Sequence, residues 1–201
     1  MIFPAKLDHL PRAGGLPVPW VALWSAEQGT AFLRDEFPQG KKHPCVAHEE
    51  RIGEGRPVFG KTSQVRQRRA MLQGLCQVCG RRLSRQFACL ETSHERWASR
   101  RGALPVPVLT ESPTCATCAV ASLEICPGLK GLRFVEVLRH VLIMQFVRPV
   151  GDPALDGMFD PLTLADFPEG GAVGYMKYAV TESAPWAPPS LAELLRKEGR
   201  P

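Results

Sequence analysis

The sequence has 201 residues, of which 44% are hydrophobic and 22% are charged. This composition suffices for one domain with an ordinary core and excludes a wholly disordered chain. The 18 glycines and 19 prolines disfavour a helical bundle and favour short elements joined by many turns. No apolar run is long enough to span a bilayer, and the first residues lack the features of a secretory signal. We therefore expect a cytoplasmic protein that does not associate with membranes.

The N-terminal third of the chain is predicted to hold little regular structure. Residues 1–19 are rich in proline and glycine and are expected to form an irregular arm. A short strand is predicted over 18–24. Residues 37–60 are predicted to be a loop, because glycine and proline recur throughout them.

A basic helix is predicted next, capped by Thr62 or Ser63 and ended by Gly74. Its apolar side chains are expected to face the core, and its basic and amide side chains the opposite side. These two sets are Val65, Leu72 and Leu75, and Arg66, Arg69 and Gln73.

Four further elements follow in the sequence. They are a helix over 116–124, strands over 134–147 and 172–180, and a helix over 191–197. The first of the strands could also begin as a helix, but valine, isoleucine and phenylalanine favour a strand. Ser190 is expected to cap the last helix, and a proline-rich linker is predicted near 182–189.

Four of the seven cysteines form two C-x-x-C pairs, Cys76 with Cys79 and Cys115 with Cys118. Each pair supplies two thiolates from one tight turn, so the two pairs together match the tetrahedral ligand set of a structural Zn²⁺ site. Four thiolates leave no position for a reactive water. An iron–sulfur cluster accepts the same ligands, and spacing alone does not distinguish the two.

The other three cysteines are Cys45, Cys89 and Cys126. They are expected to be small buried apolar residues. A second metal site formed by Cys89, His94 and Cys126 is a further hypothesis.

The positive charge of the chain is concentrated around the first cysteine pair. Residues 61–101 carry ten basic and two acidic residues, which is a net charge of +8, whereas residues 1–60 are neutral. Nine of those ten bases are arginine, which binds phosphate through two parallel hydrogen bonds. This clustering favours a nucleic-acid partner, and an acidic protein is the alternative. The residues expected to contact phosphates are Arg66, Arg69, Arg81, Arg82 and Arg85.

The segment VRQRRAMLQGLCQVCG at 65–80 resembles the entry to zinc-stabilised HNH-type nucleases. Those proteins follow a basic helix and a C-x-x-C-G turn with a loop that carries the catalytic His, which would be His94 here. Ser93 replaces the usual Asp or His before it, and no Asn or His follows Cys118 in the second helix. The resemblance therefore implies the nuclease scaffold with its catalysis lost, and nuclease activity is the enzymatic alternative.

The chain is also similar, over about residues 20–150, to a group of uncharacterised actinobacterial zinc-binding proteins. They combine a Cys-Gln-Val-Cys-Gly motif with a later Pro-x-Cys-x-x-Cys-Ala segment and a Cys-Pro step. These motifs lie here at 76–80, 113–119 and 126–127. The similarity supports the zinc module and implies no activity.

A weaker match points to zinc deaminases. His48-Glu49-Glu50 fits their H-x-E motif, and residues 113–118 come near their P-C-x-x-C motif. One His and two Cys would then hold the metal, and a Glu would carry protons to and from an activated water. This interpretation leaves Cys76 and Cys79 without a role.

Together these patterns predict an α+β fold in which a treble-clef zinc core packs on a small, mostly antiparallel sheet with Pro/Gly-rich loops. The chain would consist of an N-terminal arm (1–60), the zinc module (61–130) and a strand pair with a last helix (131–201), packed as one domain. The predicted function is zinc-stabilised, non-catalytic binding of nucleic acid, DNA or RNA. The alternatives are a protein-interaction or assembly factor, whose exposed tryptophan and proline segments make the contact, and a zinc hydrolase that uses His94 or His48.

Overall fold

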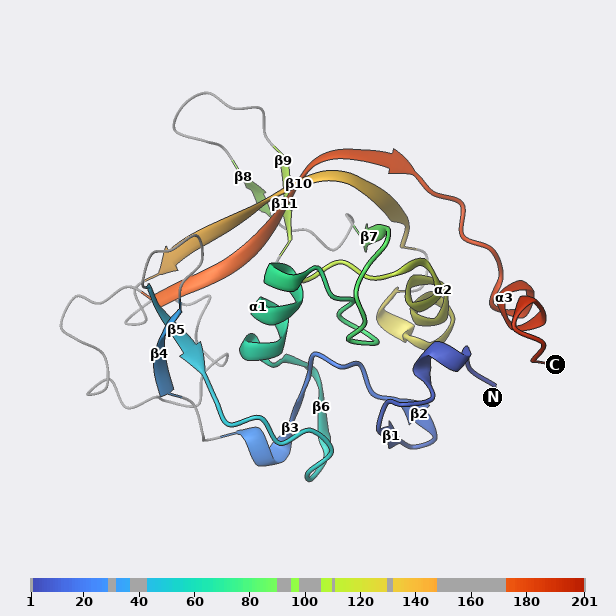
Figure 1. The fold of residues 1–201 in the computed structure, drawn as a ribbon, viewed down its shortest axis with the longest axis horizontal. Helices are drawn as coiled ribbons and strands as arrows, with labels where there is room; N and C mark the ends of the chain where they lie inside the picture. The colour runs from blue at the N-terminus through green and yellow to red at the C-terminus, as the bar shows by residue number, and fades with distance from the viewer. Residues whose placement is uncertain are drawn as a thin grey trace.

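The structure is a computed structural model. It describes residues 2–28, 32–36, 43–89, 95–97, 106–109, 111–129, 132–147 and 173–200. In these residues the fold is mixed α+β with small antiparallel sheets, so the predicted class is confirmed at this level. A long curved strand pair arches over two of the helices (Figure 1). No helix of the described part has the length and apolar character needed to cross a membrane.

The largest sheet is antiparallel and has the strand order β7-β10-β11-β9-β8. Its strands are β7 (Gln86–Cys89), β8 (Glu95–Trp97), β9 (Val106–Leu109), β10 (Phe134–Val147) and β11 (Val173–Pro185). β10 and β11 pair along nearly their whole length, with an irregular register around Arg139. Both predicted strands are thereby confirmed, and β11 continues into the segment 182–189 that was predicted to be a linker.

Among the described residues, three two-stranded sheets lie outside this sheet. They pair β1 (Arg12–Ala13) with β2 (Leu16–Pro17), β3 (Ala22–Trp24) with β6 (Pro57–Thr62), and β4 (Phe32–Glu36) with β5 (His43–Ala47). The predicted loop over 37–60 is therefore wrong, because it contains β5 and the start of β6. Proline is tolerated at the edge of a sheet, where its missing N–H need not face a partner strand, so the prolines of this segment do not prevent pairing.

The helices lie where the sequence places them. They are α1 (Gln64–Gln73), α2 (Ala116–Ile125) and α3 (Leu191–Lys197), with single turns η1 (Ala5–Leu7), η2 (Ser25–Glu27) and η5 (Pro127–Leu129). Ser63 caps α1 by accepting a hydrogen bond from the backbone N–H of Arg66 at 3.2 Å, and Gly74 ends it in the left-handed conformation. Ser190 caps α3 in the same way.

The orientation of α1, however, differs from the predicted one at Arg66 and Leu72, whereas Gln73 is exposed as predicted. Arg66 is 0% exposed, whereas Leu72 is 46% exposed. Gln67, Ala70 and Met71 are also buried. The reason lies outside the helix, in the buried carboxylate of Glu27, which binds the Arg66 guanidinium and holds this side chain inside the protein.

The buried core is divided into clusters, and one of them is made largely of cysteine. Met71 packs with residues of β7, β9, β10 and β11 beneath the strand pair. Phe87 and Phe134 pack with Ala119 of α2, and Trp186 covers them. The third cluster contains the four cysteines of the C-x-x-C pairs together with Phe3, Leu7, Leu10 and Ala121.

Candidate metal centre

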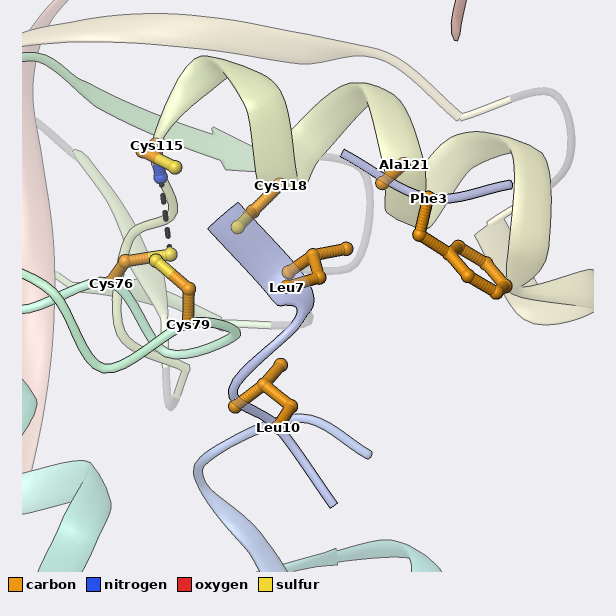
Figure 2. Close-up of a cluster of buried hydrophobic side chains, with 8 residues drawn as sticks. All are labelled: Phe3, Leu7, Leu10, Cys76, Cys79, Cys115, Cys118 and Ala121. Carbon is orange, nitrogen blue, oxygen red and sulfur yellow. Dashed lines mark hydrogen bonds between the residues drawn. The ribbon is translucent and has the colours of Figure 1, made fainter. Parts of the chain in front are cut away.

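The four cysteines of the two C-x-x-C pairs meet in one buried cluster (Figure 2). Their sulfur atoms all lie within 4.8 Å of one another, and none of them forms a disulfide. A tetrahedral Zn²⁺ with Zn–S bonds of about 2.3 Å separates its ligand sulfurs by roughly 3.8 Å. The set therefore fits one metal ion with only small adjustments. The described residues hold no second group of three or more candidate ligands.

The first pair lies in a tight turn that its backbone closes. The N–H of Gly80 donates to the carbonyl of Cys76 at 2.8 Å, and the N–H of Cys76 donates to the carbonyl of Arg81 at 2.8 Å. Gly80 has a φ of 68°, a conformation that favours glycine. A Cβ at this position would lie 2.9 Å from the ring of Trp20, so the turn is held between its own hydrogen bonds and this ring.

The second pair opens α2, as the sequence predicts. Cys115 is the N-cap residue and Cys118 lies in the first turn, so both project toward Cys76 and Cys79 (Figure 2). The positive end of the helix dipole favours thiolates at this place. The backbone N–H of Cys115 also donates to Sγ of Cys76 at 3.4 Å, which links the two pairs directly.

Hydrogen bonds between the thiols separate their pKa values. The pKa of Cys115 falls far below its ordinary range, chiefly through its hydrogen bond with Cys118. The bond with Cys115 alone would raise the pKa of Cys79, but bonds with Cys118, Cys76 and a backbone N–H outweigh it and lower this pKa to about 7. The pKa values of Cys76 and Cys118 rise, chiefly through their bonds with Cys115. A metal that takes all four sulfurs as thiolate ligands displaces the protons that they carry.

The cluster is closed to solvent. The four cysteines are at most 7% exposed, and Phe3, Leu7 and Leu10 of the N-terminal segment pack against them (Figure 2). The Lys6 ammonium lies close to the sulfurs. Burial alone would lower its pKa, but the charges of the cysteines, Cys115 first, raise it. Such a site can bind a metal, and the Lys6 ammonium neutralises part of the negative charge of the thiolates. Because all four ligands come from the protein, the site offers no open coordination position.

The N-terminal side of this site was not predicted from the sequence. The signal was present, since Phe3, Leu7 and Leu10 recur at the spacing of one side of a helix. It is outweighed by the prolines and glycines of residues 1–19. The short η1 helix places Leu7 in the cluster without a long regular element.

Of the five arginines expected to contact phosphates, Arg66 is buried within the protein. Its Nη1 lies 2.5 Å from Oε1 of Glu27 and its Nη2 lies 2.8 Å from Oε2, and Nη2 also donates to the carbonyl of Ala22 at 2.7 Å. The two side chains are 0% exposed. The expectation that Arg66 binds phosphate is therefore wrong.

The other four arginines lie at the surface. Two of them are paired with carboxylates of the described part of the chain, and two are not. Arg69 forms an ion pair with Glu50, and Arg85 forms one with Glu136. Arg81 and Arg82 are exposed, and neither forms an ion pair with a carboxylate among the described residues. Among these described arginines, the unpaired positive charge beside the first cysteine pair is thus confined to Arg81 and Arg82.

His48, the histidine of the deaminase-like motif, forms hydrogen bonds within the fold. His48 donates from Nδ1 to the carbonyl of Glu49 at 2.9 Å and accepts at Nε2 from the Ser63 hydroxyl at 2.8 Å. It is not a member of the cysteine cluster, so the interpretation as a zinc deaminase site is wrong. His94, the residue that the nuclease resemblance points to, lies outside the described residues.

The remaining cysteines and tryptophans are placed as follows. Cys45 is buried as predicted, Cys89 is half-buried, and Cys126 is exposed, contrary to prediction. Trp24 is 4% exposed, and the ring of Trp186 lies 4.3 Å from that of Phe87. Both tryptophans are therefore engaged within the fold.

Comparison with protein-family models, with curated proteins and with solved structures gave no match.

Proposed function

We propose that this protein is a non-catalytic binding protein whose fold is stabilised by one structural Zn²⁺ held by Cys76, Cys79, Cys115 and Cys118. The observation that carries this proposal is the convergence of four buried thiol groups, from two segments about 40 residues apart, within 4.8 Å. The arrangement of a C-x-x-C turn facing a second pair at a helix start supports a treble-clef centre. Such a centre contributes folding free energy and performs no chemistry.

Metal analysis tests this proposal directly. We expect one zinc per chain after purification without added metal, and none in the Cys76→Ser/Cys115→Ser variant. Cys126→Ser, which removes an exposed thiol, is the matched control and should keep the metal. Replacement by Co²⁺ should give the visible spectrum of a tetrahedral thiolate site. Iron with acid-labile sulfide would identify a cluster instead, and a metal-free folded protein would contradict the proposal.

We further propose that the partner is nucleic acid, bound through Arg81, Arg82 and Arg85 beside the first cysteine pair. Arg81 and Arg82 support this proposal because they are exposed and make no ion pair within the described residues. Arg85 would exchange its ion pair with Glu136 for a phosphate. Gly80 and the metal would fix the loop that presents these three side chains.

Binding to a labelled duplex and to a single strand at two salt concentrations tests this second proposal. We expect affinity to fall steeply with salt, and the slope to decrease by about one for each phosphate that Arg81→Ala/Arg82→Ala no longer neutralises. The control Arg56→Ala/Lys61→Ala removes two exposed charges near β6 and should leave the slope unchanged. An equal loss of affinity in both variants, or no binding at micromolar protein, would contradict a nucleic-acid site here.

A protein partner is the second candidate. Its support is the exposure of large apolar side chains, since Leu138 and Val141 of β10 are 50% and 53% exposed and Phe59 of β6 is 63% exposed. Recovery of a stable complex after nuclease treatment, abolished in Leu138→Ser/Val141→Ser, would favour this candidate over nucleic acid.

A further inference from the structure

Residues 2–10 lie across the cysteine cluster and shield it from solvent. Phe3, Leu7 and Leu10 are 3%, 1% and 6% exposed and belong to the same packed cluster as the four cysteines. Figure 2 shows Leu7 next to Cys118 and Phe3 next to Ala121 of α2. His9 adds a polar contact, since its Nε2 donates to the carbonyl of Cys79 at 2.9 Å. We call residues 2–10 the cover.

The cover is held in place by residues from the other end of the sequence. The N–H of Ala5 donates to Oε2 of Glu198 at 2.8 Å. Arg200 donates to the carbonyl of Phe3 at 2.7 Å and binds both carboxylate oxygens of Asp8. Figure 1 shows the first and last segments next to each other, beside α2 and α3. These contacts join positions 192 to 197 residues apart.

The polar contacts of the cover and the cysteine turns differ in how firmly they are held. Asp8 and Arg200 are 47% and 31% exposed, and water competes for such pairs. The cysteine turns share the buried apolar packing of the cover, but they are also closed by backbone hydrogen bonds. A terminal segment that has this packing and exposed polar contacts, but not the backbone hydrogen bonds of the turns, opens at a smaller free-energy cost than the turns do.

We propose that the cover is a gate for the metal site, held shut by Arg200 and Glu198, and that metal exchange and thiol attack proceed through its opening. The part of the proposal that concerns metal exchange rests on the proposed function, because exchange requires a bound ion. The part that concerns attack on the thiols applies with or without the ion. Opening would withdraw Phe3, Leu7 and Leu10 from the cysteine cluster in one step, since they belong to one segment.

The first experiment measures zinc release from the loaded protein into an excess of a coloured chelator. We expect the rate to become independent of chelator concentration at high chelator, because opening of the cover then limits it. Arg200→Ala and Asp8→Ala should each raise this limiting rate, on the order of three- to tenfold. Arg200→Ala should have the larger effect, since it also removes the bond to the carbonyl of Phe3, and the double variant should add little to Arg200→Ala because Asp8 holds the cover through Arg200. Arg51→Ala, which removes an exposed ion pair with Glu49 at 2.6 Å, is the matched control and should release zinc at the wild-type rate.

The second experiment follows alkylation of each cysteine by mass spectrometry in metal-loaded and metal-free protein. Cys45 is 0% exposed and lies outside the cluster, so it reports global unfolding. Faster labelling of the four cluster cysteines than of Cys45 in Arg200→Ala supports the gate, and parallel labelling of all five overturns it. Equal zinc release from Arg200→Ala, Asp8→Ala and wild type also overturns it. A protein that binds no metal refutes the proposed function instead, and the labelling of the metal-free protein then decides the gate alone.

Discussion

Gly80 satisfies two requirements of the metal centre at once. Its φ of 68° lets the backbone turn back after Cys79, and its missing side chain leaves room for the ring of Trp20. The first requirement can be read from the C-x-x-C-G pattern. The second cannot, because Trp20 is sixty positions away and only the fold brings it to the turn.

Gly80→Ala should therefore destabilise the protein by more than the loss of a favourable backbone conformation. We expect a decrease of about 2–4 kcal/mol in the free energy of unfolding, which combines strain at positive φ with displacement of the Trp20 ring. Urea unfolding of the metal-loaded protein measures it.

Gly14→Ala separates these two contributions. Gly14 has a φ of 58°, and a Cβ there would have nothing within 4 Å, so its substitution should cost only about 1 kcal/mol. Equal losses of stability at both positions would show that Trp20 does not confine the turn.

Helix α1 illustrates the limits of periodicity as a guide. Its start, end and caps follow from Ser63 and Gly74, and the structure confirms them. The orientation of the helix does not follow from its sequence, because the amphipathic pattern is interpreted on the assumption that arginine faces water. Arg66 instead pairs with Glu27 inside the protein, and Arg68 donates to the carbonyl of Val46 at 3.1 Å. Arg66 and Arg68 thus attach the helix to β3, η2 and β5.

Glu27→Ala should be among the most damaging single substitutions outside the metal site. Removing one partner of a buried ion pair leaves the other charge without compensation, at a cost of about 3–5 kcal/mol. Glu54→Ala, an exposed change in the turn before β6, should lie within about 0.5 kcal/mol of wild type by the same urea unfolding measurement. A Glu27→Met/Arg66→Met variant should recover much of the stability, and failure to do so would show that Glu27 acts through contacts other than Arg66.

The carboxylate of Glu27 also makes the free energy of unfolding depend on pH. Burial raises the pKa of Glu27, but the hydrogen bond from Arg66 and those from the backbone N–H groups of Trp24 and Arg51 outweigh burial and lower the pKa below the ordinary 4.5. Its stabilisation is therefore fully present above pH 4.5 and is lost as the pH falls through the folded-state pKa. Unfolding free energies measured between about pH 3 and 6 should fall less steeply in Glu27→Gln than in wild type. Parallel curves would contradict this assignment.

The two ends of the described chain and both cysteine pairs converge on the same cluster. Residues 2–10 cover it, α2 supplies two of its thiols, and α3 contributes Leu191 to its packing. Because much of this cluster is sulfur rather than hydrocarbon, a bound metal would replace part of an apolar core. The same convergence explains why the predicted N-terminal arm is packed rather than loose.

Removal of the metal should consequently destabilise the fold well beyond the two cysteine turns. We expect chelation to lower the unfolding midpoint sharply and to increase proteolysis within residues 2–10, with both effects reversed by zinc. The measurement is thermal unfolding with limited proteolysis before chelation, after it and after readdition. An unchanged midpoint in metal-free protein would show that the cysteine cluster packs without an ion.

Elements that are determined by residues close together in the sequence could be predicted from the sequence alone. The caps at Ser63 and Ser190, the turn at Gly80, the helix that opens at Cys115 and the long strand over 134–147 follow from neighbouring residues. The grouping of four cysteines could also be predicted, because metal-ligand chemistry leaves few arrangements for two C-x-x-C pairs.

Features that depend on contacts between distant residues required the folded structure. The burial of Arg66, the pairing of Arg69 and Arg85, and the cover formed by Phe3, Leu7 and Leu10 each depend on partners that no local pattern specifies. A guanidinium is equally suited to a phosphate in solvent and to a buried carboxylate. The position of Glu27 in the fold selects between them, and it removes one arginine from the surface that the charge pattern had assigned to a partner.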